Sequence, residues 1–369
     1  MIRGRIVLPD GVIDDGIVVI DGETIVAVEP STGDGHEFVG TILPGLVDIH
    51  CHGGGGATFT TVDPAEAEAA AAHHHSRGTT TVLASLVTAP PADLEAQIGA
   101  LRPLVTSGVL AGIHLEGPFL SAHRCGAQDP ASLADPDPAL TARLLDAAGG
   151  TVRMMTIAPE LPGYDGVAEL LADSGVVVAL GHSDADFDLF RRALHGEASV
   201  VTHLANGMPP IHHRSAGPVG AALVEAAAQN TIVELIADGV HVDAGFTALV
   251  FEIASHNVAL VTDAMAAAGM PDGTYPLGPQ RVTVEGGVAR VASGSIAGGT
   301  SNLLENVVRC ADAGVPLVEA VRAASTTPAR AIGLGNVCGA IRPGLRADAV
   351  IVDDDLQLVD VMRGGKWVR

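Results

Sequence analysis

Two histidines, His50 and His52, directly follow the apolar run GLVDI and have a spacing that suits metal binding. Side chains alternate along an extended chain with a period of two, so both imidazoles can face the same way while Cys51 points elsewhere. A His-x-His pair alone is a weak signal. Its interpretation depends on which other residues the fold brings beside it.

Residues with metal-binding side chains also close four other apolar runs of the chain. These residues are Glu116, His182, His203 and Asp263. Nitrogen and carboxylate ligands without thiolate suit Zn²⁺ or another divalent transition metal that keeps an open position for water. Such a metal lowers the pKa of bound water to about 7, which predicts a hydrolase. The alternative is that these polar residues only cap loops.

Other histidines of the chain have simpler interpretations. His73, His74 and His75 lie in an alanine-rich helical run, where the pattern predicts a solvated helix face. His114 shares a strand face with Glu116, two positions away, and is therefore the residue most easily mistaken for a ligand.

The elements that must position these side chains alternate between apolar runs and Ala-, Leu- and Glu-rich helical segments. Continuous apolar strands indicate a parallel sheet that is buried on both faces. Eight such strands predict an α/β fold, a (β/α)8 TIM-like barrel, in which the reacting groups sit at the carboxyl ends of the strands. The runs are residues 45–50, 79–88, 111–117, 151–160, 176–185, 199–206, 232–241 and 258–265.

The two ends of the chain have a different pattern. Residues 1–44 and 336–369 contain short alternating runs broken by Asp-Gly and Gly-Gly turns, which indicates antiparallel strands. We expect the two termini to form one small β-sandwich domain, discontinuous in sequence, beside a hydrolase barrel of residues 45–335.

The composition of the 369 residues excludes several classes of protein. Hydrophobic residues make up 47% and charged residues 17%, which excludes a disordered chain. The formal net charge of −23 predicts no nucleic-acid partner and no binding to anionic membranes. No apolar run reaches the roughly 18 residues of a transmembrane helix. We therefore expect a cytoplasmic protein.

The small numbers of cysteines and lysines exclude further kinds of site. The four cysteines are too sparse for a disulfide framework, so free thiols are expected. Cys125, in a glycine-containing loop, is expected to be a surface thiol. The one lysine, Lys366, is badly placed for a P-loop, a Schiff base or a carboxylated lysine that bridges two metals.

Motifs along nearly the whole chain resemble the N-acetylglucosamine-6-phosphate deacetylases of the amidohydrolase superfamily. The resemblance implies metal-dependent hydrolysis of the acetamide of N-acetylglucosamine-6-phosphate to glucosamine-6-phosphate and acetate, a reaction of amino sugar catabolism and cell-wall recycling. The motifs are PGLVDIHCHG (44–53), HLEGPFLS (114–121), GHSDA (181–185), THLANGMPP (202–210), IADGVHVD (236–243), VTDAM (261–265) and TTPARAIGL (326–334).

Ligand roles follow from the same resemblance. It implies that Glu116, His182 and His203 bind the principal metal, and that Asp263 is the general base and then the general acid. The His50–His52 pair implies room for a second metal. The implied cofactor is Zn, with one or two ions per subunit, and Fe, Mn and Co are the alternatives.

The resemblance also implies a set of substrate contacts. It makes His241 a substrate ligand, places Asn206 and Gly207 beside the phosphate, and makes Arg214 a phosphate ligand from the partner subunit of a homodimer. An acidic protein that binds a phosphate needs a local cation, and an arginine can hold a phosphate by two hydrogen bonds. The alternative for Arg214 is a solvated basic loop.

Gln128 departs from the family pattern, which often has histidine at this position. A glutamine amide can donate a hydrogen bond but cannot carry a proton. Gln128 is therefore expected to contact substrate and not to act as a catalyst.

Other functions remain open. The ligand set also fits an amidohydrolase that acts on a cyclic amide, a nucleobase or a different N-acyl amino sugar. A non-catalytic sugar-phosphate-binding protein would be expected to lack Asp263. A serine hydrolase is not supported, because no G-x-S-x-G motif follows a strand.

Overall fold

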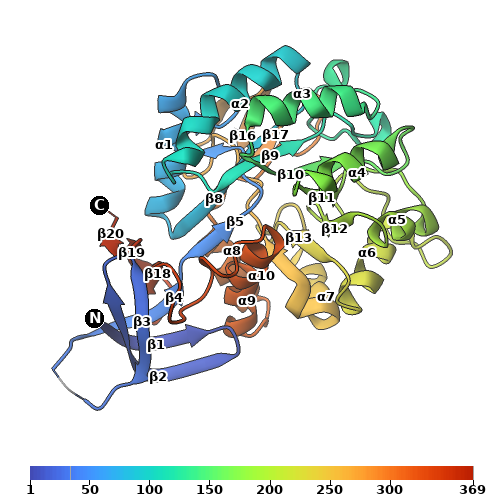
Figure 1. Ribbon diagram of the computed structural model, residues 1–369. Coiled ribbons are helices and arrows are strands. Elements are labelled where there is room, and N and C mark those ends of the chain that lie inside the picture. Colours follow the sequence, from blue (N-terminus) through green and yellow to red (C-terminus); the bar gives the residue numbers. More distant parts are fainter. Residues whose placement is uncertain (34, 369) are drawn as a thin grey trace.

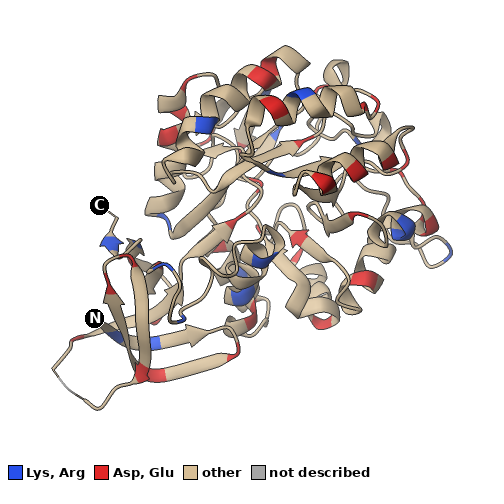
Figure 2. Ribbon diagram, in the orientation of Figure 1, with Lys and Arg blue, Asp and Glu red and all other residues tan. Residues whose placement is uncertain are grey.

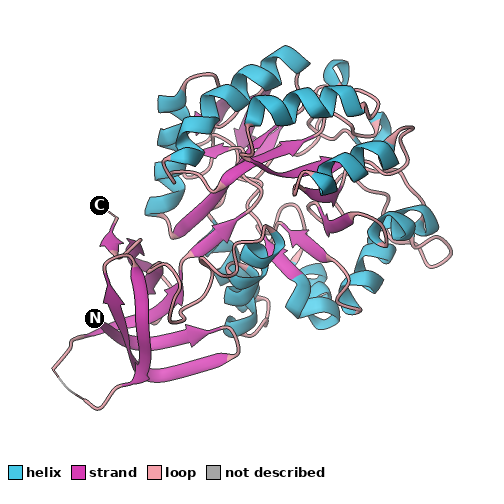
Figure 3. Ribbon diagram, in the orientation of Figure 1, coloured by secondary structure: helices cyan, strands magenta, loops and turns pink. Residues whose placement is uncertain are grey.

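Eight parallel strands form a nearly closed barrel inside a ring of helices, and a second sheet built from both chain ends lies beside it (Figures 1 and 3). The computed structural model describes residues 1–33 and 35–368. Each strand matches one of the eight apolar runs, with β12 beginning one residue before its run, and the predicted fold class is confirmed. The barrel strands are β5 (Leu46–Asp48), β8 (Thr79–Leu86), β9 (Gly112–Glu116), β10 (Val152–Ile157), β11 (Val177–Leu180), β12 (Ala198–Val201), β13 (Ile232–Leu235) and β14 (Val258–Leu260).

The barrel closes where its first strand meets its last. Beyond the ends of β5 and β14, the amide of Asp263 donates to the carbonyl of His50 at 2.9 Å, and the amide of His52 donates to the carbonyl of Ala264 at 2.7 Å. Below them the hydroxyl of Thr262 donates to Asp48 at 2.6 Å. Two predicted ligand segments are thus joined directly by backbone hydrogen bonds.

The inside of the barrel is filled by apolar side chains from most of its strands. Branched residues such as Val47, Val200 and Val261 are fully buried there. The end of α10 (Thr326–Ala331) adds Ala329 and Ile332 to the same cluster. The barrel is therefore a packed core and not a channel, and the predicted metal-binding residues lie at its carboxyl end.

Helices surround the barrel, and several begin at an aspartate whose side chain accepts a hydrogen bond from an amide of the first turn, as at Asp63, Asp137, Asp186 and Asp243. Figure 2 shows acidic residues spread over this outer layer. None of the helices among the described residues is long and apolar enough to span a membrane. The helices are α1 (Pro64–Ser76), α2 (Pro91–Thr106), α3 (Pro138–Ala148), α4 (Tyr164–Asp173), α5 (Phe187–Leu194), α6 (Gly217–Ala227), α7 (Ala244–Ala254), α8 (Leu303–Asp312), α9 (Leu317–Ala323) and α10.

Strands from both chain ends share one seven-stranded sheet, in which β4 pairs with β18. Ile25 on β3 and Met362 on β19 belong to the same buried cluster, so the sheet folds over on itself around an apolar core. Contrary to the purely antiparallel expectation, β1 runs parallel to β4. We propose that this unit ends near residues 44 and 336. Its strands are β1 (Ile2–Leu8), β2 (Gly11–Asp21), β3 (Thr24–Pro30), β4 (Phe38–Pro44), β18 (Ala349–Val352), β19 (Leu358–Arg363) and β20 (Lys366–Trp367).

A three-stranded antiparallel sheet after β14 was not among the predicted elements. It consists of β15 (Gly273–Leu277), β16 (Gln280–Glu285) and β17 (Val288–Arg290). Val282 and Val284 alternate with exposed residues and pack towards Met265 beside the barrel. The alternating run RVTVE (281–285) is the signal for this sheet in the sequence, and it lies between the last barrel strand, β14, and α8.

The buried carboxylate of Glu225 on α6 offers a test of how this outer layer is stabilised. It accepts hydrogen bonds from Asn230 at 2.7 Å and Arg191 at 2.6 Å, and it lies 3.0 Å from His195. Burial raises the pKa of Glu225, but hydrogen bonds from Asn230, Arg191 and His195 lower it to about 2. A depressed pKa stabilises the fold above the unfolded-state pKa, and this stability is lost as the pH falls towards the folded-state value.

We therefore expect Glu225→Gln to lower the free energy of unfolding by about 1–2 kcal/mol at neutral pH. The difference from the wild-type protein should shrink once the pH falls below about 5, because the unfolded glutamate then binds its proton. Urea unfolding over a pH series measures both effects. The exposed Glu252→Gln serves as the control, and a pH-independent difference would contradict the interpretation.

Candidate metal and active site

The residues predicted as ligands and base converge at the carboxyl end of the barrel. Each stands at or just after the end of a different strand, apart from the pair that follows β5. Their side chains are between 0% and 13% exposed. The residues are His50 and His52 after β5, Glu116 at the end of β9, His182 after β11, His203 after β12 and Asp263 after β14.

Glu116, His182 and His203 form one group of atoms that could hold a metal ion. Oε1 of Glu116 lies 2.9 Å from Nε2 of His182 and 3.0 Å from Nε2 of His203. The two Nε2 atoms are 3.0 Å apart. The three residues that the resemblance assigned to the principal metal thus lie together.

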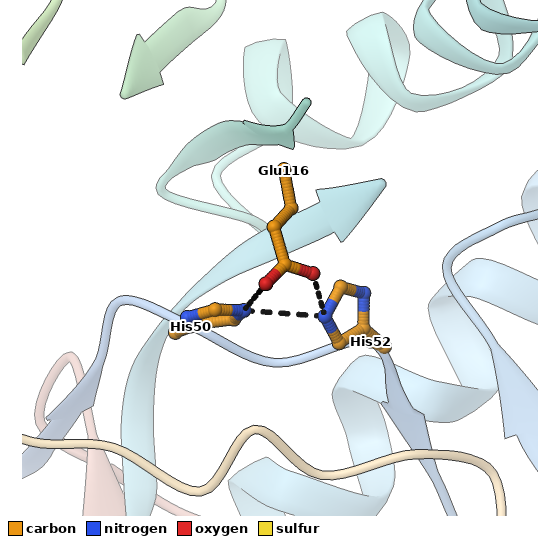
Figure 4. Close-up of side chains that lie close together, drawn as sticks. All are labelled: His50, His52 and Glu116. Atoms are coloured by element: carbon orange, nitrogen blue, oxygen red, sulfur yellow. Dashed lines mark hydrogen bonds and ion pairs between the residues drawn. The ribbon is translucent and has the colours of Figure 1, made fainter. Parts of the chain in front are cut away.

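His50 and His52 form a second group with the same glutamate (Figure 4). Nε2 of His52 lies 3.2 Å from Oε2 of Glu116, and the Nε2 atoms of the two histidines are 3.2 Å apart. Oδ1 of Asp263 is 3.2 Å from Nε2 of His52 and 3.5 Å from Nε2 of His50. Glu116 therefore lies between the two groups: its Oε1 faces His182 and His203 and is 3.6 Å from Nε2 of His50, and its Oε2 faces His52.

Backbone strain is concentrated in these residues. His182 has a φ of 47°, His203 of 27° and Asp263 of 47°, in the left-handed region that side chains with a Cβ rarely adopt. They are half of the six non-glycine residues with positive φ in the described part of the chain. Such strain persists where the surrounding structure determines the backbone firmly, and it is frequent at functional sites.

Hydrogen bonds fix which nitrogen of each imidazole faces the centre. Nδ1 of His52 donates to the carbonyl of Ser85 at 3.0 Å, and Nδ1 of His182 donates to the carbonyl of Arg124 at 2.7 Å. A carbonyl only accepts, so Nδ1 carries the proton in both rings. Nδ1 of His50 likewise faces a buried carboxylate. The Nε2 lone pairs of these rings therefore point inwards.

The donor set fits a divalent cation. The unprotonated imidazole nitrogens lie about as close to one another as to the carboxylate oxygens. Their lone pairs repel one another and the carboxylates unless a cation binds between these atoms. Outer contacts from Nδ1 to oxygen are the usual support of metal-binding histidines. Nitrogen and oxygen donors without sulfur are those that Zn²⁺ and neighbouring transition metals accept.

The two carboxylates of the site are held in their charged form. Burial raises the pKa of Glu116, but the neighbouring imidazoles of His50, His182 and His203 outweigh burial and lower it well below its ordinary value. Burial also raises the pKa of Asp263, and His50 and His52 reverse this effect and lower it. Asp263 is therefore a carboxylate that can accept a proton.

A cavity of about 290 Å³ opens onto these groups and is the space available to a substrate. Asp263, Asn206, Gly207, His241 and Gln128 all line it. The loop after the three-stranded sheet covers one side with Ser295, Ile296 and Gly298, beside Leu277 of β15. The metal-binding groups, the predicted base and most predicted substrate contacts therefore share one cavity.

Gln128 is held against Glu116 rather than free in the cavity. Its amide nitrogen donates to Oε2 of Glu116 at 2.5 Å, and its oxygen accepts from the amide of Thr88 at 2.8 Å. The side chain is 6% exposed. Its predicted contact with substrate stays a prediction, and the structure adds that it orients a ligand carboxylate.

His241 is oriented by Asp238, which lies at the start of the same loop. Oδ2 of Asp238 accepts from Nδ1 of His241 at 2.8 Å, and Oδ1 accepts from the amides of Val240 and His241. Burial lowers the pKa of His241, and the contact with Asp238 raises it above its ordinary value. Nε2 of His241 is left for a ligand in the cavity.

The residues predicted to contact phosphate lie apart from one another. Asn206 and Gly207 line the cavity, whereas Arg214 is exposed and does not. Nη1 of Arg214 donates to Nε2 of His213 at 2.7 Å. The contribution of Arg214 to a partner subunit stays a prediction.

His114 is a buried structural residue, as expected. Its Nδ1 lies 2.9 Å from Oγ of Ser85 and its Nε2 lies 2.8 Å from Oγ1 of Thr156. Both nitrogens are therefore occupied by hydroxyl groups of neighbouring strands. Burial and the charge of His50 lower the pKa of His114, which keeps the ring neutral beside the metal-binding groups.

The prediction of a solvated face at His73–His75 is wrong. His74 is fully buried and His75 is 8% exposed, because α1 packs on the hairpin of β6 (Gly53–Gly54) and β7 (Ala57–Thr58). Nε2 of His74 donates to the carbonyl of Gly53 at 2.8 Å and lies 3.2 Å from Sγ of Cys51. The ring supports the segment that carries the first histidine pair.

Two carboxylates beside the site were missed. Asp238 orients His241, and Glu234 on β13 contacts His50. The signal for Glu234 was a charged residue inside the apolar run IVELIADGVH, and a buried charge requires a partner.

Comparison with known proteins agrees with this geometry. The Amidohydrolase family matches residues 41–368, so the chain belongs to the amidohydrolase family, as the motifs predicted. The N-acetylgalactosamine-6-phosphate deacetylase of Escherichia coli O157:H7 is 34% identical over 98% of this chain and 97% of its own. The N-acetylglucosamine-6-phosphate deacetylase of Bacillus subtilis is 33% identical over 86% and 82%.

Solved structures of N-acetylglucosamine-6-phosphate deacetylases are similar to this chain over its whole length. The structure of N-acetyl-D-glucosamine-6-phosphate deacetylase from Mycobacterium smegmatis has a TM-score of 0.94 and 40% identity, and covers 100% of this chain and 99% of that one. A mutant of that enzyme in complex with N-acetyl-D-glucosamine-6-phosphate matches equally well. An adenosine deaminase from Xanthomonas campestris, at 16% identity and a TM-score of 0.61, shares the fold.

The two metal-binding groups can be separated by mutation. We expect His182→Ala or His203→Ala to abolish binding of the principal metal, and His50→Ala to weaken only a second ion. Glu116→Gln should weaken both, because the carboxylate contacts both groups.

Elemental analysis of the dialysed variants measures these effects, with the exposed His256→Ala as the control. If His50→Ala emptied the protein of metal, the division into a principal and a second group would be wrong.

Proposed function

We propose that this protein hydrolyses the acetamide of N-acetylglucosamine-6-phosphate and releases acetate and glucosamine-6-phosphate. The observation that carries the proposal is the carboxylate of Asp263, which faces the cavity beside two groups of metal-binding atoms. The Bacillus subtilis relative, at 33% identity, and the Mycobacterium smegmatis structures, at 40% identity, support the same reaction.

Glu116, His182 and His203 would hold the principal metal, and His50 and His52 a second ion. Zn²⁺ fits these nitrogen and oxygen donors best, and Fe, Mn and Co are alternatives with similar ligand preferences. When bound, a divalent metal of this kind polarises the amide carbonyl and makes water acidic enough to react near neutral pH.

Asp263 carries the proton through the reaction. Its carboxylate takes a proton from water as the water oxygen forms a bond to the acetyl carbon. The protonated Asp263 then donates this proton to the amide nitrogen while the carbon–nitrogen bond breaks. Acetate and the free amine leave, and Asp263 returns to its charged form.

Other residues of the cavity would hold the sugar phosphate. His241, with Nδ1 tied to Asp238, presents Nε2 to the substrate. Asn206 and Gly207 would lie beside the phosphate. Arg214 would complete the phosphate site of the other subunit in a homodimer, which agrees with its exposure and its position outside its own cavity.

We also propose that the enzyme acts in the cytoplasm, on a small sugar phosphate and without nucleic-acid or membrane partners. All four cysteines are free, as is usual in a reducing compartment. The net charge of −23 disfavours binding to nucleic acid and anionic lipid.

The C4 epimer of this substrate is the main alternative, because one relative of nearly equal length is an N-acetylgalactosamine-6-phosphate deacetylase. Cyclic amides and nucleobases are less well supported, since the adenosine deaminase shares only the fold. The structures at 40% identity favour the glucosamine substrate.

Acetate release from both epimers tests the proposal and the role of Asp263 together. We expect a higher kcat/KM for N-acetylglucosamine-6-phosphate. Asp263→Asn should lower kcat by roughly 10²–10⁴-fold with metal still bound, because asparagine keeps the shape and cannot accept a proton. The exposed Asp188→Asn is the control. Preference for the galactosamine epimer, or near-normal turnover of metal-loaded Asp263→Asn, would contradict the respective assignment.

Arg214→Ala should raise KM for the phosphorylated substrate strongly and leave the weak activity on N-acetylglucosamine unchanged, because only a phosphate contact is lost. Exposed Arg192→Ala is the control. Mixing Arg214→Ala with Asp263→Asn subunits should restore part of the activity, since one site of a mixed dimer then has both residues intact. Subunit exchange without recovery would exclude a contribution from the partner subunit.

A further inference from the structure

Glu234 is a fully buried carboxylate on β13 that belongs to neither metal-binding group. Its Oε2 atom nevertheless lies 3.0 Å from Nδ1 of His50 and 3.0 Å from the backbone nitrogen of His203. One oxygen atom thus contacts a residue of each group, on the side away from the cavity.

The contact with His50 decides which of its nitrogens faces the metal-binding centre. The carboxylate accepts a hydrogen bond from Nδ1–H of His50, so that Nε2 points at His52 and Glu116 with a free lone pair. His52 and His182 have backbone carbonyls in this role, which no side-chain mutation removes. Among these three histidines, only His50 is oriented by a side chain.

The contact with His203 acts on the backbone. His203 has a φ of 27°, and its Nδ1 is a buried atom without a hydrogen-bond partner among the described residues. No hydrogen bond at Nδ1 therefore orients this ring among the described residues, whereas the rings of His50, His52 and His182 each have one. The hydrogen bond from its amide to Glu234 holds the strained turn that aims the ring at Glu116.

We propose that Glu234 is a positioning residue that fixes the two metal-binding groups relative to each other. It fixes the tautomer of His50 and the turn at His203 through one shared oxygen atom. The proposal rests on the metal sites of the proposed function, and it assigns Glu234 no contact with substrate.

Metal binding without substrate provides the test. Metal-free protein is titrated with Co²⁺, whose visible absorption reports both affinity and coordination geometry. For Glu234→Ala we expect Co²⁺ affinity of the His50 group to fall about 10- to 100-fold, with an altered spectrum and a smaller loss at the His203 group. Glu234→Gln should recover most of the affinity, because the amide oxygen can accept both hydrogen bonds.

Glu225→Ala is the matched control, since Glu225 is equally buried but lies on α6 and binds Arg191. If Glu234→Ala does not fold, Glu234→Asp takes its place, because the shorter side chain keeps the charge and cannot reach both donors. Wild-type Co²⁺ affinity and spectrum in the folded Ala or Asp variant would overturn the proposal. So would an equal loss in Glu225→Ala.

The two proposals fail in different ways. Wild-type protein that binds Co²⁺ but releases no acetate from either sugar phosphate contradicts the proposed function and leaves the role of Glu234 intact. Acetate release by wild-type protein, together with unchanged metal binding in the Glu234 variants, contradicts only the role of Glu234.

Discussion

The carboxylate of Glu116 contacts imidazoles from three strands, and the structure depends on keeping this assembly of charged and polar groups out of water. A buried carboxylate costs several kcal/mol unless its oxygens are satisfied. Here Oε1 lies against His182 and His203, and Oε2 lies against His52 and accepts a hydrogen bond from the amide of Gln128. The parallel barrel makes this arrangement possible because all strand ends meet at one rim.

Apolar side chains fill the barrel below this rim, and their close packing holds the residues at the rim in place. Packed side chains such as Val47 and Val261 leave the strands little freedom to move. The strained turns at His182, His203 and Asp263 are held by this rigid base. The groups are thus arranged before any ligand arrives, which is the condition for effective electrostatic catalysis.

Much of this could be predicted from the sequence because barrel strands are continuous apolar runs and the functional residues directly follow them. All eight strands match the expected runs to within one residue, and the period of two correctly placed His50 and His52 on one side with Cys51 turned away. The burial of His74 could not be predicted, because it depends on a hairpin packing against α1. The role of Glu234 likewise depends on neighbours that lie far away in the sequence.

The pairing of β4 with β18 has a consequence for the order of folding. Leu43 pairs with Val350, and almost the whole barrel sequence lies between them. During synthesis, β4 emerges early beside β1 but must wait for β18 until the barrel has been translated, and contacts of such long range form late. Because β4 continues almost directly into β5, the strand that leads to His50, the last strands to be made help to anchor the first metal-binding residues.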